Sequence, residues 1–247
     1  APRIGRARAN GMKMVVVDPR MSKTGEKADT WLPVKPGNDA DLAWGLIRWI
    51  VENERYDEQY LRCPSPAVAE SIGEPTWCDA TYLVKQDDPA GGLLTAADLG
   101  LPLPEADPET GETPPPPPIV MVDGNPLPLG AVDQLADLEV DTTVVTPDGR
   151  IPVKSVFTML KERALERTLD DYAEASGIPV EQIETVAREF TSHGKQAVVM
   201  SYRGPAMHGN GFNAIRAIGY LNFLVGNHDW KGGHIGSQQG FSPQQGR

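Results

Sequence analysis

Two short apolar runs, each ending in a polar turn, constrain the fold more than any other feature of this chain. The first, residues 14–17, stops at Asp18-Pro19-Arg20, and the second, residues 31–34, leads into a turn at residues 36–39. Unbroken β-branched runs suit strands of a parallel sheet that is covered on both faces. Because ligands bind at the carboxyl ends of such strands, both turns are expected to face one binding crevice.

The rest of the chain alternates helical and strand patterns. Apolar residues recur at helical spacing over residues 39–52, 180–192 and 212–225, and the apolar run 197–200 predicts a buried strand. This alternation predicts an α/β fold, a Rossmann-like parallel sheet with helices on both faces. We expect residues 1–84 and 151–240 to form the two halves of one such domain, and residues 241–247 to form a tail leading to a further segment.

Residues 85–150 have a different character. Proline and glycine are dense, residues 114–118 are all proline, and acidic residues dominate. Short β-like pieces at 119–122 and 142–145 are followed by Asp-Gly turns. We interpret this segment as an extended Pro/Gly-rich insertion that lies on the surface and has no core of its own.

Composition excludes several functions. The formal charge of −11 argues against a nucleic-acid surface, which needs clustered Lys and Arg. No apolar run approaches the ~18 residues of a membrane span, so no direct membrane insertion is expected. Cys63 and Cys78 lack metal-ligand spacing, which predicts ordinary thiols, or a disulfide in an oxidising compartment, and no metal site. The chain opens at Ala1 instead of methionine, and we expect it to be part of a longer protein.

Asp18 and the following turn are the first candidates for a binding site. A carboxylate at a strand end can accept hydrogen bonds from the N1 and N2 donors of guanine or from ribose hydroxyls. The alternative is an aspartate that accepts only from nearby turn amides. The turn at residues 36–39 offers backbone amides at a helix start, which favours an anion, although many αβ loops share this pattern.

Two glycine-rich loops, residues 204–211 and 226–236, flank the last helix. Glycine lets a flat ligand lie against the backbone, although plain turns also explain these loops. His208 lies within the first loop and can donate to an anionic oxygen or relay a proton. Two interpretations are open for His228 and His234: they line the same pocket as His208, or, as we favour, each is a surface loop residue. The chain has no Gly-x-Gly-x-x-Gly motif after its first strand, no Walker loop and no nucleophile elbow, so the pattern predicts ligand binding without reactive groups of its own.

Taken together, these segments resemble the molybdopterin oxidoreductases of the dimethyl sulfoxide reductase family. The resemblance rests on matches at both ends of the chain, in the order that the family has them: residues 11–20, 28–39, 177–180, 204–211, 221–227 and 232–233. Within the family, residues 168–173 and 204–212 are most similar to the catalytic subunits of tetrathionate reductases.

The resemblance implies a cofactor and its binding residues. Two molybdopterin guanine dinucleotides per parent enzyme would hold Mo or W, and a 4Fe-4S cluster is expected in a preceding part of the parent. Asp18 and the 36–39 turn would bind the guanosine end, and the glycine loops would approach the pterin and a substrate funnel, in which His208 is the catalytic candidate. The implied cofactor-binding residues are Asp18, Arg20, Pro36, Gly37, Asn38, Asp39, Gly204, Gly226, Asn227, Gly232 and Gly233.

The implied function is that of a cofactor-binding domain in an oxidoreductase that reduces a sulfur oxyanion such as tetrathionate. The chain alone is expected to be inactive. Arsenate, thiosulfate or polysulfide reduction remain alternatives, as does a non-catalytic nucleotide-binding module. The resemblance also implies two protein partners of the parent, one an iron-sulfur electron-transfer subunit and the other a membrane-anchor subunit. It further implies a periplasmic location at the outer face of the cytoplasmic membrane.

Overall fold

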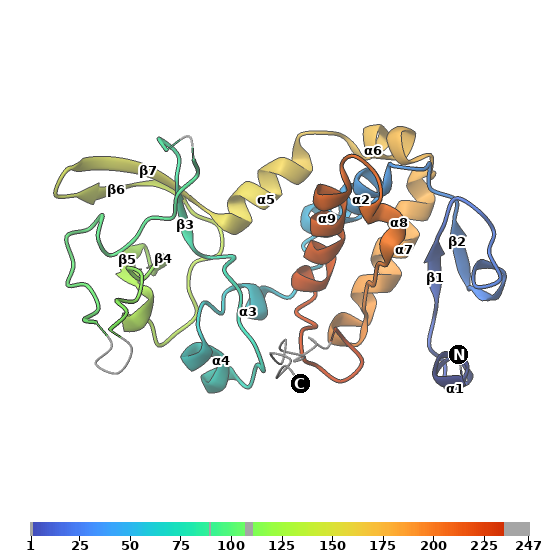
Figure 1. The fold of residues 1–247 in the computed structure, drawn as a ribbon, viewed down its shortest axis with the longest axis horizontal. Coiled ribbons are helices and arrows are strands. Elements are labelled where there is room, and N and C mark those ends of the chain that lie inside the picture. The colour runs from blue at the N-terminus through green and yellow to red at the C-terminus, as the bar shows by residue number, and fades with distance from the viewer. Residues whose placement is uncertain (1, 89, 107–110, 235–247) are drawn as a thin grey trace, which may run out of the picture. The chain divides into compact units, whose positions relative to one another are not determined.

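The computed structural model describes residues 2–88, 90–106 and 111–234 (Figure 1). The chain divides into two compact units. The first unit comprises Ala1–Arg55 and Ala164–Asn222, and the second comprises Tyr56–Arg163 and Phe223–Arg247. The predicted mixed α/β class is confirmed.

The first unit is mostly helical. Its elements, with α9 ending two residues beyond the unit, are α1 (Pro2–Ala9), β1 (Val15–Val17), η1 (Gly25–Lys27), β2 (Thr30–Leu32), α2 (Asp39–Glu52), α6 (Leu169–Ser176), α7 (Val180–Ser192), η3 (Gly194–Gln196), α8 (Arg203–Ala206) and α9 (Gly211–Leu224).

Strands β1 and β2 form the parallel pair that the two apolar runs predict, with Val15 opposite Thr30 and Val17 opposite Leu32. The expected covering of both faces is wrong for β1, because Val15 and Val17 are 38% and 45% exposed. The Asp18 amide donates to the Leu32 carbonyl at 3.2 Å, and the Trp31 indole nitrogen donates to the Asp18 carbonyl at 2.8 Å. Because the strands are parallel, Asp18 and the chain that follows Leu32 leave the pair at the same end.

Helix α2 packs against α6 and α7 and positions the turn at its own start. The shared core contains side chains from β2, α2 and α7. Each fully buried aliphatic side chain contributes about 1.5–3 kcal/mol to the stability of the fold. Its buried members are Leu32, Val34, Leu42, Ile178, Ile183 and Val186. The apolar faces that these helices show in the sequence are therefore the faces that they bury.

The predicted buried strand at residues 197–200 is not formed. The segment has no strand partner among the residues described, and Val198 and Met200 are 40% and 82% exposed. Instead, the Asn222 side chain forms hydrogen bonds with the backbone of Val199. It accepts from the Val199 amide at 3.0 Å and donates to the Val199 carbonyl at 2.9 Å. An apolar run becomes a buried strand only beside other strands. Among the described residues, the parallel sheet of the first unit has two strands. The wider Rossmann-like sheet remains a prediction.

The second unit is built around antiparallel strands. Its elements are α3 (Glu58–Leu61), α4 (Pro66–Ile72), β3 (Leu83–Lys85), β4 (Ile119–Val122), β5 (Asn125–Pro128), η2 (Leu129–Ala131), β6 (Asp141–Thr146), β7 (Gly149–Ser155) and α5 (Val156–Leu165), the last ending beyond the unit. One sheet has the order β3-β7-β6, and β4 and β5 form a separate hairpin. The hairpin turns at Asp123-Gly124, as the sequence predicts.

Residues 85–150 differ from the expected surface insertion. They bury Leu94, Ile119, Met121 and Val144 in a core that also contains Leu83 and Val153 from the flanking strands. The short β-branched runs are long enough to pair, and each buries one face when paired. Because β3 pairs with β7 across this segment, the units divide near residues 55 and 163 and not at 84 and 151.

No helix among the described residues is both long enough and apolar enough to cross a membrane.

Candidate functional site

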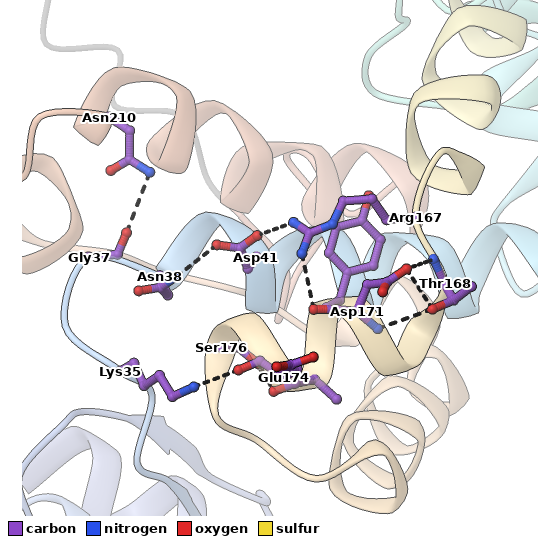
Figure 2. Close-up of polar contacts among 12 residues, drawn as sticks. Lys35, Gly37, Asn38, Asp41, Arg167, Thr168, Asp171, Glu174, Ser176 and Asn210 are labelled. Carbon is purple, nitrogen blue, oxygen red and sulfur yellow. Dashed lines mark hydrogen bonds and ion pairs between the residues drawn. The ribbon is translucent and has the colours of Figure 1, made fainter.

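The turn at residues 36–39 and the loop at residues 204–211 come together in the first unit. Gly37 has a φ of +84°, and a Cβ atom built on it would lie 3.4 Å from His208 Nδ1. The Asn210 side-chain amide donates to the Gly37 carbonyl at 3.4 Å, as Figure 2 shows. Glycine is favoured at position 37 by its left-handed backbone. The imidazole of His208 therefore lies against a backbone that has no side chain.

The start of α2 carries backbone donors and carboxylates together. Asn38 precedes the helix, but its side chain does not cap it and donates instead to Asp41 Oδ2 at 3.1 Å (Figure 2). The first turn also contains Asp39, which the helix dipole stabilises. A free phosphate would meet the negative charge of Asp39 here, whereas a group that donates hydrogen bonds would find an acceptor. The turn is thus better suited to a base edge or a sugar hydroxyl than to a phosphate.

Arg167 fixes the far side of this turn. Its Nη1 lies 2.7 Å from Asp41 Oδ1, and its Nη2 donates to the Asp171 carbonyl at 3.1 Å. The guanidinium also stacks over the Tyr172 ring, 4.9 Å from the centroid. Arg167 therefore neutralises Asp41. The other carboxylate of the first turn, Asp39, forms no ion pair with a described side chain.

Helix α6 holds the turn from its two ends. At its start, the Thr168 hydroxyl and amide both donate to Asp171, which lowers the pKa of that carboxyl, and the Asp171 amide donates back to Thr168 (Figure 2). At its end, Lys35 Nζ donates to the Glu174 carbonyl at 2.6 Å, and the Lys35 amide donates to the Ser176 carbonyl at 2.9 Å. A cation at a helix C-terminus is favourable, and here it anchors the chain just before Gly37.

Asp18 partly follows the local-turn alternative. Its Oδ1 accepts the amide of Arg20 at 2.9 Å, which closes the turn after β1. The described residues offer Oδ2 no hydrogen-bond donor, and the side chain is half-buried. One carboxylate oxygen is therefore structural, and the other is available to a ligand at the strand end. Arg20 itself is exposed beside it.

The 204–211 loop is an open surface loop. Gly204 has free space around it, whereas a Cβ on Gly211 would lie 2.3 Å from the Ala206 carbonyl oxygen. His208 is exposed, and Met207 beside it is 78% exposed. Gly211 is therefore required by the close approach of the backbone, while His208 is accessible and is positioned by the Gly37 turn.

The loop with Gly226, Asn227, Gly232 and Gly233 belongs to the second unit. It is closed by two backbone bonds, from His234 to the Asn227 carbonyl at 3.1 Å and from Asp229 to the His234 carbonyl at 2.8 Å. Whether this loop and the 204–211 loop serve one ligand stays a prediction.

Two histidines in this second loop differ from the exposed residues expected from the sequence. His228 stacks on Phe223 with ring centroids 4.3 Å apart and pairs with His234, and both are half-buried. Burial, followed by the neighbouring His234, lowers the pKa of His228. A further anchor is the Trp230 indole, which donates to Glu74 Oε2 at 2.9 Å. The loop is therefore a folded structure and not a loose turn.

Three residues at or beside this turn, Asn210, Asp41 and Arg167, were not predicted from the sequence. Asn210 follows His208 within the glycine loop, and Asp41 lies on the first turn of a helix with a recognisable start, so their positions gave a usable signal. Arg167 gave none, because its partner is distant in sequence.

Both cysteines are buried, and in the described part of the chain they do not form a disulfide. Burial raises the pKa of Cys78 to about 12, so it remains a thiol at neutral pH. The described part of the chain contains no cluster of three or more His, Cys, Asp or Glu that would hold a metal ion.

The fold is that of an α/β protein in which polar turns follow two parallel strands. A family model described as molybdopterin oxidoreductase matches residues 2–242. The chain belongs to this family, as its sequence motifs indicate.

Known relatives agree with this assignment. A selenate reductase subunit from Mesobacillus selenatarsenatis is 39% identical over 94% of this chain and 21% of its own length. A tetrathionate reductase subunit from Salmonella typhimurium is 39% identical over 89% of this chain and 21% of its own length. The structure of acetylene hydratase from Pelobacter acetylenicus superimposes with a TM-score of 0.52 at 22% identity, covering 92% of this chain and 19% of that one, which supports the fold alone. The chain spans about a fifth of the length of these relatives.

Proposed function

We propose that the first unit binds the guanosine end of a molybdopterin guanine dinucleotide within the catalytic subunit of a Mo- or W-dependent oxidoreductase. The observation that carries this proposal is the meeting of Gly37, His208 and Asn210 at the turn between β2 and α2. A bound cofactor would supply the redox chemistry, which the described side chains do not themselves provide.

The donor and acceptor groups of the turn suit guanosine. Guanine presents neighbouring N–H donors, and Asp18 after β1 and Asp39 at the start of α2 each offer a carboxylate oxygen as an acceptor. The bare backbone of Gly37 lets a flat base or a ribose approach closely. Asn38 and Pro36 shape the turn, and Arg20 is placed to meet an anionic part of the ligand.

His208 has a role at the ligand in this proposal. Its ring is exposed and lies over Gly37, so it can stack on the bound group or donate to it. A direct catalytic role in a substrate funnel, which the sequence resemblance implies, remains a second candidate. Gly204, Gly226, Asn227, Gly232 and Gly233 are proposed to approach the pterin.

For the parent enzyme we propose reduction of a small chalcogen oxyanion, with tetrathionate as the first candidate. Relatives named selenate reductase and tetrathionate reductase at equal identity support this class and do not separate the two substrates. Arsenate, thiosulfate and polysulfide remain alternative substrates within the same family. The proposal includes a 4Fe-4S cluster elsewhere in the parent, a periplasmic location, and partner subunits that carry iron-sulfur clusters or anchor the enzyme to the membrane.

Variants of the full-length protein in which an aspartate is replaced by the neutral asparagine test the binding site. Asp39→Asn should lower the guanine nucleotide released by acid, because a charge-assisted hydrogen bond contributes about 1.5–3 kcal/mol. Asp170→Asn is the matched control, since it makes the same change in the first turn of α6. Equal nucleotide content in wild type and Asp39→Asn would remove Asp39 from the site. Oxidation of a reduced viologen by tetrathionate, selenate and arsenate then ranks the substrates.

A further inference from the structure

The second unit has an open sheet edge at β6. The sheet order β3-β7-β6 leaves one side of β6 without a neighbouring strand in the described part of the chain. In the register with β7, Thr143 lies opposite Pro152 and Val145 opposite Arg150. Because proline has no N–H, Thr143 and Pro152 form a non-hydrogen-bonded pair.

The direction of the β6 peptide groups follows from this register. The Pro152 carbonyl accepts the Gln86 amide on the β3 side, and the Ser155 amide donates to the Val140 carbonyl on the β6 side. Antiparallel strands alternate, so the N–H and C=O groups of Thr143 and Val145 face away from β7. Among the residues that the structure describes, these groups have no backbone partner. The edge thus offers a row of free donors and acceptors.

Between Asp141, which begins β6, and Pro147, which follows it, the sequence of this edge lacks the usual protection. Natural sheets block an open edge with lysine, proline or a bulge. Residues 142–146 are Thr-Thr-Val-Val-Thr, without charge, proline or glycine, and Val145 is 71% exposed. A short uncharged β-branched run on an open edge recruits further strands. Such an edge is stable in solution when another strand covers it.

A hollow beside this edge is acidic. Its walls are β6 and the β4–β5 hairpin, and its lining includes Asp137, Glu139 and Asp141 but neither lysine nor arginine. Lys161 neutralises Glu139 at 2.7 Å. Lys154 is shared between Asp141 at 3.5 Å and Glu162 at 2.5 Å, which leaves one carboxylate of that pair uncompensated. Asp137 accepts only the neutral amide of Gly124 in the described structure.

We propose that β6 binds, by strand addition, an extended segment of a partner polypeptide that carries lysine or arginine. Main-chain bonds to Thr143 and Val145 provide the pairing, and the carboxylates of the hollow select cationic side chains. A second copy of β6 is a poorer occupant, because it would bring two acidic hollows together. This inference does not depend on the proposed cofactor.

A synthetic nine-residue peptide tests the edge on the full-length protein. The probe alternates lysine with valine or threonine and carries a fluorescein label, and its binding is measured by fluorescence anisotropy at low and moderate salt. The matched probes replace lysine with glutamate, or N-methylate every second backbone amide. We expect the lysine peptide to bind at least tenfold more tightly than either control, and more weakly as salt rises. Equal binding of the lysine and glutamate peptides, or no binding, would overturn the proposal.

Variants of β6 separate strand addition from surface adsorption. Thr143→Pro removes one edge N–H without removing a bond to β7, and Thr143→Ala is the control that keeps the N–H. We expect at least tenfold weaker peptide binding for Thr143→Pro and a change within twofold for Thr143→Ala. Loss of the salt dependence is expected in a D137N/E139Q/D141N variant. A dimer that Thr143→Pro abolishes would instead assign the edge to a second copy and reject a cationic partner.

Discussion

Replacing Gly37 with alanine tests the geometry of the turn most closely. At a φ of +84° an alanine is strained by about 1–2 kcal/mol, which its smaller unfolded-state entropy offsets by about 0.4–1 kcal/mol. The new Cβ would lie 3.4 Å from His208 Nδ1, an ordinary contact that adds little. The net destabilisation should therefore be about 1 kcal/mol in urea unfolding of the 247-residue chain.

Gly11→Ala is the matched control for this change. Gly11 lies in the same unit, has a φ of +94° and has nothing within 4 Å of a new Cβ. Both variants should lose similar stability, but only Gly37→Ala should lower guanine nucleotide retention in the full-length protein, by tenfold or more, about 1.4 kcal/mol. Equal retention in the two variants would refute the claim that ligand approaches the Gly37 backbone.

Three further predictions concern other parts of the chain. Arg167→Ala and Asp41→Asn should show a coupling of about 0.5–1 kcal/mol in a double-mutant cycle, since the pair is partly exposed, and a coupling near zero would contradict the role of Arg167 at the turn. The pKa of Cys78 is raised to about 12 in the folded state from 9.0, so the thiol ionises first in the unfolded state. The free energy of unfolding should therefore fall by about 1.4 kcal/mol per pH unit as pH rises from 9 to 12. Cys78→Ala should reduce this slope. Met200→Ser should change the stability of the isolated chain by less than about 0.5 kcal/mol, because Met200 is exposed, and a larger loss would show that the 197–200 segment is buried.

The sequence predicted the local elements of the first unit well. The β1–β2 pair, the start of α2 and the apolar face of α7 follow from residue type and spacing, because each is decided within a few residues. The capping of α6 by Thr168 is equally local, because its partner Asp171 lies three residues away. The family assignment rests on several motifs that occur in the family's order, and no single motif would be specific enough.

The long-range features were not predictable from the sequence. The core of residues 85–150 depends on β3 meeting β7 across the segment, and proline-rich composition concealed that pairing. The 197–200 run has strand character but no neighbouring strand in the described chain, and pattern alone does not show the neighbour. Likewise, His208 and Gly37 lie in turns that are far apart in the sequence. Each turn was predicted as a candidate site, but the contact between them was not.

The most direct test of the central claim is the amount of guanine nucleotide bound by the full-length protein. The protein should be purified gently after expression with its cofactor machinery, and acid-released guanine nucleotide should be measured against molybdenum and tungsten. We expect two guanine nucleotides per metal atom, with a lower ratio of nucleotide to protein in the Asp39→Asn variant. A protein with neither guanine nucleotide nor metal would contradict the proposed cofactor site and favour a nucleotide-binding module without redox chemistry.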